Sequence, residues 1–171
     1  LGLEHYSLYQ LTYEDTTPLG RAARAGKVLP LDSDTEALFY TQTLAKMAEA
    51  GRPSYEVSNF SVKGRQCRHN TEIWQGGAYI GIGPGAHGRE RRSGELHATE
   101  RLSDPQAWRQ QVSEKGHGYK TCTPLLPGEL AQELILLGLR LTQGIDRKLY
   151  NRLTGFDLYE VISPLAIQRL V

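Results

Sequence analysis

The chain has 171 residues and a formal net charge of +1 at pH 7, from 20 Lys and Arg against 19 Asp and Glu. This length suits one ordinary domain or a large piece of a bigger protein, and the balanced composition argues against global disorder. The charge balance gives no support to a nucleic-acid surface. The longest mainly apolar stretch, residues 134–141, is broken by Gly138 and Arg140. It is far shorter than the roughly 18 residues of a membrane helix, so we expect no membrane span.

The cysteines and the chain ends suggest a compartment and a longer parent protein. Cys67 and Cys122 are the two cysteines, too few for a disulfide framework or a four-thiolate cluster, which fits a reducing cytoplasm. The first residue, Leu1, is no initiator Met, and neither a basic region nor a signal peptide follows it. The chain stops at Val171 without a turn signal. We therefore expect both ends to be cuts.

The N-terminal half predicts strands around one helix. Residues 5–13, rich in Tyr and Leu, indicate a strand, and residues 21–31 a basic connection. The S-x-x-E pattern that starts at Ser33 is typical of a capping box and predicts a helix over residues 34–50. Residues 54–60 indicate a second strand and residues 78–82 a short third one. The order strand, helix, strand favours a parallel crossover.

The C-terminal half is predicted to be helical. Asp104 before Pro105 predicts a helix to about Lys115. Leucines spaced by four and three residues form an apolar stripe over residues 130–141, and shorter helices are expected over 146–153 and from Asp157. The composition changes near residue 100, and we expect a domain boundary between Arg92 and Asp104. The predicted fold class is therefore α/β, with an α/β part followed by a mainly helical part.

A glycine-rich segment follows the third predicted strand. Gly83, Gly85 and Gly88 fit the G-x-G-x-x-G pattern of dinucleotide-binding folds. Such a fold needs a helix directly after the glycines, and residues 89–94 have no helical apolar period. We therefore reject the dinucleotide fold. Two readings stay open: a flat ligand approaches the bare backbone, or two strands pack tightly there.

Residues 67–74 combine Cys67, His69 and Trp74. An imidazole is a good ligand for iron or zinc, and an indole five positions later could stack on a planar macrocycle. A structural zinc site needs about four ligands, so zinc is disfavoured. The alternative is structural: His69 forms a hydrogen bond within a loop and Trp74 packs in the core.

Several basic residues could pair with carboxylates, because the guanidinium of Arg binds them in a bidentate way. Their alternative role is to face water, and Glu129 and Glu133 are read as surface or first-turn acids. The helices after Pro127 leave a DNA-binding helical module open as an alternative. The basic residues are Lys63, Arg65, Arg68, Arg89, Arg91, Arg92 and Arg101.

Four ordered blocks together resemble one family: residues 5–12 (HYSLYQLT), 55–60 (YEVSNF), 67–70 (CRHN) and 79–88 (YIGIGPGAHG). This is the radical S-adenosylmethionine group of oxygen-independent coproporphyrinogen III oxidase-like proteins, which includes haem chaperones. The resemblance implies a partial (β/α) barrel that holds a [4Fe–4S] cluster and S-adenosylmethionine. The family's cluster-binding CxxxCxxC motif is missing from this sequence, so the resemblance implies no cluster in this piece.

The resemblance also divides the chain and points to site residues. It implies that residues 1–100 form the C-terminal portion of the radical S-adenosylmethionine barrel and residues 101–171 an incomplete helical C-terminal domain. Haem-binding members carry an HNxxYW motif, which here starts at His69 and ends at Trp74, with Ile73 in place of the Tyr. His69 is therefore the implied axial metal ligand of haem, with Trp74 beside it. The implied S-adenosylmethionine contacts are Thr12, Gly83, Ala86 and His87.

The function implied by the resemblance is a haem-binding chaperone that delivers haem to acceptor haemoproteins. The rival within the family is oxygen-independent coproporphyrinogen III oxidation, a radical decarboxylation. Because the two share a fold, fold does not choose between them.

Overall fold

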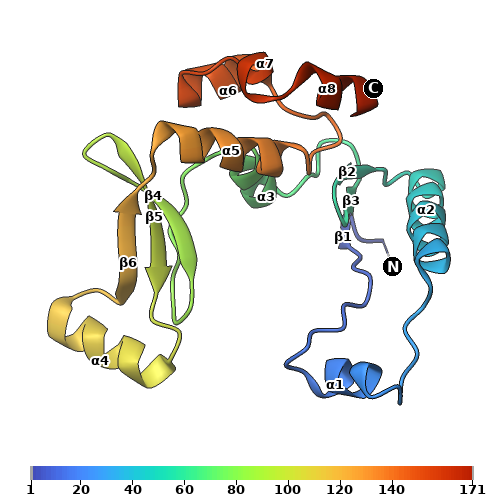
Figure 1. Cartoon of the computed structure of the whole chain (residues 1–171), viewed down its shortest axis with the longest axis horizontal. Helices are drawn as coiled ribbons and strands as arrows, with labels where there is room; N and C mark the ends of the chain where they lie inside the picture. Colours follow the sequence, from blue (N-terminus) through green and yellow to red (C-terminus); the bar gives the residue numbers. More distant parts are fainter. Residues whose placement is uncertain (1, 171) are drawn as a thin grey trace. The chain divides into compact units, whose positions relative to one another are not determined.

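The computed structural model describes residues 2–170, apart from the side chains of Ile167 and Leu170. The chain divides into two compact units, Leu1–Cys67 and Arg68–Val171, whose elements are labelled in Figure 1. The domain boundary predicted between Arg92 and Asp104 falls inside the second unit, in a range that is occupied by the strand over Glu95–Arg101. Each unit has its own three-stranded sheet.

The sheet of the first unit consists of three short strands, β1 (His5–Ser7), β2 (Ser54–Glu56) and β3 (Asn59–Ser61). Their order is β1-β3-β2, and both neighbouring pairs are antiparallel. The predicted single strand over residues 54–60 is therefore wrong: it is a hairpin whose turn holds Ser58 at a φ of 69°. The predicted parallel crossover is confirmed, because β1 and β2 are both antiparallel to β3 and therefore run parallel to each other, with β3 lying between them.

Two helices complete this unit, α1 (Pro18–Arg24) and α2 (Ser33–Glu49). The cap of α2 is Asp32, whose carboxylate accepts a hydrogen bond from the Thr35 amide at 2.9 Å, so the cap predicted at Ser33 lies one position too late. The sequence reading missed α1, although Pro18 occupies its first turn, where proline is well tolerated. The strand predicted over residues 5–13 ends at Ser7.

The sheet of the second unit is antiparallel and follows the glycine-rich segment. Its strands are β4 (His87–Arg92), β5 (Glu95–Arg101) and β6 (Tyr119–Pro124), in the order β4-β5-β6. A strand rather than a helix follows the glycines, which confirms that this is no dinucleotide-binding turn. The strand predicted at 78–82 is reduced to one bridge, between Tyr79 and Arg89. The helical reading of the second half overlooked β6.

The helices of this unit are α3 (Arg68–Trp74), α4 (Pro105–Lys115), α5 (Pro127–Gly138), α6 (Arg147–Thr154), α7 (Leu158–Val161) and α8 (Pro164–Leu170). The helix starts predicted at Asp104, Asp146 and Asp157 are confirmed, since each carboxylate accepts hydrogen bonds from the amides of the helix that follows.

The core of the second unit lies where α5 meets α6 and α7, and Figure 1 shows α6 beside α5. Ala131, Leu134, Tyr150 and Leu158 are buried there. Gly138 is the last residue of α5, and its lack of a side chain lets Ile145 pack closely, since a Cβ at this position would lie 2.6 Å from Cγ1 of Ile145. These contacts hold α5 against α6 and α7, and α5 also contacts α3, which carries His69. Across residues 2–170, no helix combines the length and apolar character that crossing a membrane requires.

Candidate functional site

Helix α3 carries His69 in its first turn. The side chain is exposed, and its imidazole forms no hydrogen bond with any described residue. The ring stands edge-on to Tyr79, with the ring centroids 6.4 Å apart and the planes at 85°. A neutral imidazole in this state keeps a lone pair that can coordinate a metal ion. The structural alternative, a hydrogen bond within a loop, is therefore wrong for His69.

Trp74 ends the same helix but does not share the face of His69, because five positions turn a helix by roughly 140°. The guanidinium carbon of Arg140 lies 4.3 Å from the indole ring centroid, a cation–π contact. The indole Nε1 is buried and has no hydrogen-bond partner within residues 2–170. Trp74 packs against the segment after α5, and it also lines the cavity whose wall includes Tyr79, the residue that contacts His69.

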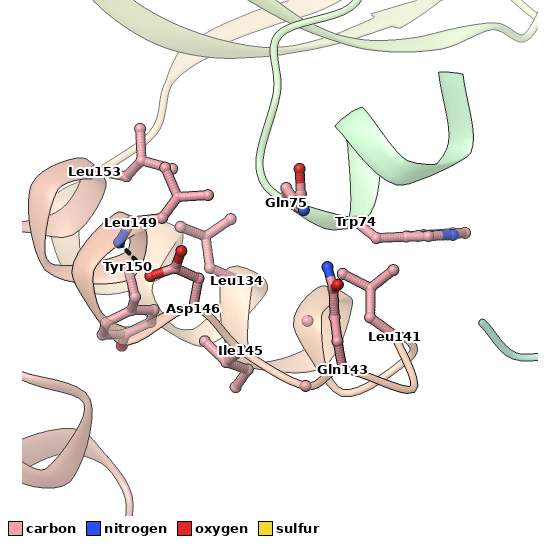
Figure 2. A pocket seen from close by; sticks show the side chains of 12 residues that line it. Trp74, Gln75, Leu134, Leu141, Gln143, Ile145, Asp146, Leu149, Tyr150 and Leu153 are labelled. Atoms are coloured by element: carbon pink, nitrogen blue, oxygen red, sulfur yellow. Dashed lines mark hydrogen bonds between the residues drawn. The ribbon is translucent and has the colours of Figure 1, made fainter. Parts of the chain in front are cut away.

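A first cavity, the Trp74 cavity, opens beside this indole and has a volume of about 280 Å³. Figure 2 shows Trp74 at the end of α3 and Gln75 directly after it, with Leu141 and Gln143 facing them from the segment after α5. Asp146 is the acid of this cavity, and its carboxylate caps α6. The walls are formed by Trp74, Gln75, Leu134, Gly138, Leu141, Gln143, Gly144, Ile145, Asp146, Leu149, Tyr150 and Leu153.

A second cavity, the Arg89 cavity, has a volume of about 400 Å³ and shares Trp74 and Leu134 with the first. Tyr79 also lines it, so the residue that contacts His69 belongs to its wall. Most of its surface is aliphatic or aromatic, as in ordinary small-molecule sites. The lining residues are Ile73, Trp74, Gly76, Gly77, Tyr79, Arg89, Leu96, Leu130, Glu133, Leu134, Leu136 and Leu137.

The charged groups of the Arg89 cavity form a bidentate ion pair. Nε of Arg89 donates to Oε1 of Glu133 at 2.8 Å, and Nη2 donates to Oε2 at 2.9 Å. The hydrogen bond with Glu133 raises the pKa of the Arg89 guanidinium, while burial opposes the rise. Each side chain is 23% exposed. The reading of Glu133 as a surface acid was therefore wrong.

The glycine-rich segment combines both readings that its sequence left open. A Cβ at Gly81 would lie 2.3 Å from the carbonyl oxygen of His87, and one at Gly88 would lie 2.8 Å from the amide nitrogen of Gly81, so the backbones there are tightly packed. Gly83, at a φ of 99°, has open space where a Cβ would stand. A flat ligand can approach the backbone at Gly83 but not at Gly81.

The four predicted S-adenosylmethionine contacts fall into two groups. The Ala86 amide donates to the carbonyl of Gly83 at 3.3 Å, and the exposed His87 starts β4 directly afterwards. Gly83 and Ala86 therefore lie in one turn, and His87 follows it directly. Thr12 is exposed in the irregular segment after β1, in the other unit.

The placement of the His, Cys, Asp and Glu side chains decides whether the described residues could hold a metal ion or an iron–sulfur cluster. Within residues 2–170, no three His, Cys, Asp or Glu side chains gather closely enough to hold a metal ion. Cys67 and Cys122 lie in different units. An iron–sulfur cluster takes about four thiolates, so the residues present do not fit one.

Most of the basic residues singled out in the sequence are ion-paired. Arg65 pairs with Glu4, Arg68 with Glu72, Arg89 with Glu133, and both Arg92 and Arg101 with Glu90. Their charges are therefore met within the fold.

Comparisons with known proteins identify the class to which the fold belongs. No family model matches the chain. Among solved structures, coproporphyrinogen III oxidase (HemN) from Escherichia coli, a radical S-adenosylmethionine enzyme, aligns with a TM-score of 0.67 at 13% identity. The alignment covers 96% of this chain and 41% of that one. The fold is thus that of part of a radical S-adenosylmethionine enzyme, which confirms the predicted fold class.

The chain is also similar in sequence to two kinds of known protein. Radical S-adenosyl methionine domain-containing protein 1 from Bos taurus is 37% identical over 91% of this chain and 37% of its own length. Heme chaperone HemW from Bacillus subtilis is 30% identical over 92% of this chain and 41% of its own length. The chain spans about two fifths of the length of these relatives. Its homologues are thus radical S-adenosyl methionine domain-containing proteins and HemW haem chaperones, and the match is to the C-terminal part of such proteins.

Proposed function

We propose that this chain is the haem-binding part of a haem chaperone, in which His69 is an axial ligand of the haem iron and acceptor haemoproteins receive the haem. The observation that carries the proposal is the exposed His69 imidazole. It has no hydrogen bond within the described residues, and it contacts Tyr79 at the edge of an apolar cavity. The HemW relatives, which are named as haem chaperones, support the same function.

The chemistry of His69 suits a cargo that must be taken up and released. Imidazole nitrogen is a common axial ligand of haem iron. Because the ligand stands at the surface, the iron can be reached by a competing ligand from an acceptor protein without unfolding of the donor. The aromatic and aliphatic wall that begins at Tyr79 suits the apolar faces of a tetrapyrrole.

Of the two cofactors that the family resemblance implies, the residues of this chain fit S-adenosylmethionine but not the [4Fe–4S] cluster. The open backbone at Gly83, with Ala86 in the same turn and His87 directly after it, fits a contact with S-adenosylmethionine, and Thr12 is proposed as a fourth contact. In this family S-adenosylmethionine supplies radical chemistry when it is bound. The two thiols do not fit a [4Fe–4S] cluster, so no reaction step is assigned to one here.

The second candidate is radical decarboxylation of coproporphyrinogen III. The likeness of the fold to coproporphyrinogen III oxidase from Escherichia coli is compatible with this reaction, although a shared fold does not choose between the two functions. Its test is incubation of the full-length, reconstituted protein with coproporphyrinogen III. Formation of protoporphyrinogen would replace the chaperone proposal.

The chaperone proposal is tested by haem titration of the full-length protein, followed through the Soret absorbance. His69→Ala is expected to lose the ligand-field spectrum of the wild type. His117→Ala is the matched control, because it removes an exposed imidazole from the same unit, away from α3. Identical spectra for wild type and His69→Ala would contradict the assignment of His69.

Two further expectations stay predictions. The cytoplasmic location is one of them, since relatives from Bos taurus and Mus musculus carry the word mitochondrial in their names.

Binding of duplex DNA by residues 104–171 is the other. It requires a retarded band that weakens as salt rises.

A further inference from the structure

The Arg89 cavity has charged side chains in a mainly apolar wall, and a purely apolar ligand would have no use for them. At about 400 Å³ it lies within the range of small-molecule sites, which combine apolar walls with a few placed polar groups. Here the charged groups are Arg89 and Glu133. Both side chains keep 23% of their surface exposed, so a ligand that enters can reach them.

The guanidinium of Arg89 is held by more than Glu133. Its Nη1 donates to the carbonyl oxygen of Gly88 at 3.0 Å, while Nε and Nη2 face the carboxylate. The Nη1 hydrogen bond goes to the backbone and does not involve Glu133. It therefore holds the guanidinium in place when another carboxylate replaces that of Glu133 at Nε and Nη2. A fork of this kind matches the two oxygens of any carboxylate.

Backbone pairing ties this fork to the proposed iron ligand. The Tyr79 amide donates to the Arg89 carbonyl at 2.7 Å, and the Arg89 amide donates to the Tyr79 carbonyl at 2.8 Å. The Tyr79 ring in turn contacts His69. Tyr79 therefore lies between the imidazole of His69, which could bind a metal, and the guanidinium of Arg89, which could bind a carboxylate. A tetrapyrrole has the matching arrangement, with a metal at its centre and carboxylates at its rim.

We infer that Arg89 binds a propionate of the tetrapyrrole and that Glu133 occupies the same fork when the cavity is empty. This inference rests on the proposed haem-binding function and adds the group of the ligand that the cavity recognises. One carboxylate replaces another, so the guanidinium is never left buried without a partner, which would be costly. The returning carboxylate of Glu133 competes with the propionate and favours release.

The test compares haem with its dimethyl ester, in which both propionates are uncharged, on the full-length protein. Arg89→Gln is expected to weaken haem binding about tenfold or more, the size of one charged hydrogen-bonding partner, and to leave binding of the ester unchanged. Glu133→Gln is expected to tighten haem binding and to slow transfer of haem to apomyoglobin. Arg91→Gln, an exposed change on the same strand, is the matched control.

The outcomes separate this inference from the proposed function. If wild type binds neither haem nor the ester, the proposed function fails. Two results would overturn the inference while the proposed function stands, provided that haem binds through His69. In the first, Arg89→Gln weakens the binding of haem and of the ester equally; in the second, it weakens the binding of neither. Faster transfer from Glu133→Gln would likewise overturn the role given to Glu133.

Discussion

Arg101 donates a hydrogen bond from Nε to the carbonyl oxygen of Gly81 across 3.0 Å, which joins β5 to the glycine-rich segment. Its Nη2 also pairs with Glu90 at 2.9 Å, and the two side chains are each 11% exposed. The guanidinium carbon lies 3.7 Å from the ring centroid of Tyr119 on β6. One side chain thus holds the glycine-rich segment and all three strands of the second sheet together.

We expect Arg101→Met to lower the free energy of unfolding by about 3 kcal/mol, because the change removes one partner of a buried ion pair. The measurement is urea unfolding followed by tryptophan fluorescence. Arg109→Met, an exposed substitution on α4, should change the stability by less than about 0.5 kcal/mol. Equal stability of the two variants would show that the Arg101 contacts contribute nothing measurable.

A glycine on the chain between α4 and β6 allows Trp108 to pack closely. A Cβ at Gly118 would lie 2.3 Å from Nε1 of Trp108 and 2.4 Å from its Cδ1. Gly118→Ala is therefore expected to cost about 2 kcal/mol through overpacking and to alter the near-ultraviolet circular dichroism of the indole.

The matched control for this substitution is Gly128→Ala in the first turn of α5, where a Cβ would meet nothing within 4 Å. Removing a helical glycine should leave the stability unchanged or raise it by up to about 1 kcal/mol. A loss for Gly128→Ala as large as that for Gly118→Ala would contradict the steric explanation.

The cap of α6 gives the second unit an acid-sensitive helix. The Leu149 amide, through its hydrogen bond, lowers the pKa of Asp146 below its ordinary value of 3.8; burial opposes this, and the Lys148 amide adds to it. A carboxyl whose pKa is lower in the folded chain stabilises the fold above the unfolded pKa. That contribution is lost as the pH falls through 3.8 to the folded value.

We therefore expect α6 to loosen on acidification from about pH 5 to about pH 2, as followed by NMR of its amides. Asp146→Asn is expected to keep α6 capped, since Asn caps helices as well as Asp, and to reduce the pH dependence. If the Asn variant were to loosen as steeply as wild type, the acid sensitivity would belong to another group.

Helix ends were predictable from the sequence because each depends on a few neighbouring residues. Helices were expected to start at Asp104, Asp146 and Asp157, and each of these residues caps its helix through hydrogen bonds that span two or three positions. Strands of three residues leave too short a pattern to be recognised, which explains the error at residues 54–60. The pairing of β6 with β5 depends on residues some twenty positions away, and no local signal reveals it.

The candidate site was predictable only in part, for the same reason. His69 could be recognised from its motif, and its exposure agrees with a ligand role. Tyr79, Arg89 and Glu133 could not be grouped with it, since the Arg89–Glu133 pair joins positions 44 residues apart. The basic character of Arg89 was visible, but its partner depends on how α5 packs.

The central position of β3 has a consequence for the order in which the first unit folds. β3 pairs with β2 across a two-residue turn and with β1 through pairs such as His5 with Ser61. A hairpin forms within microseconds, whereas bringing β1 to it closes a loop of about 50 residues at a larger entropic cost. Formation of α2 shortens that loop, because 17 residues in a helix span only about 25 Å. The hairpin and α2 should therefore form before β1 completes the sheet.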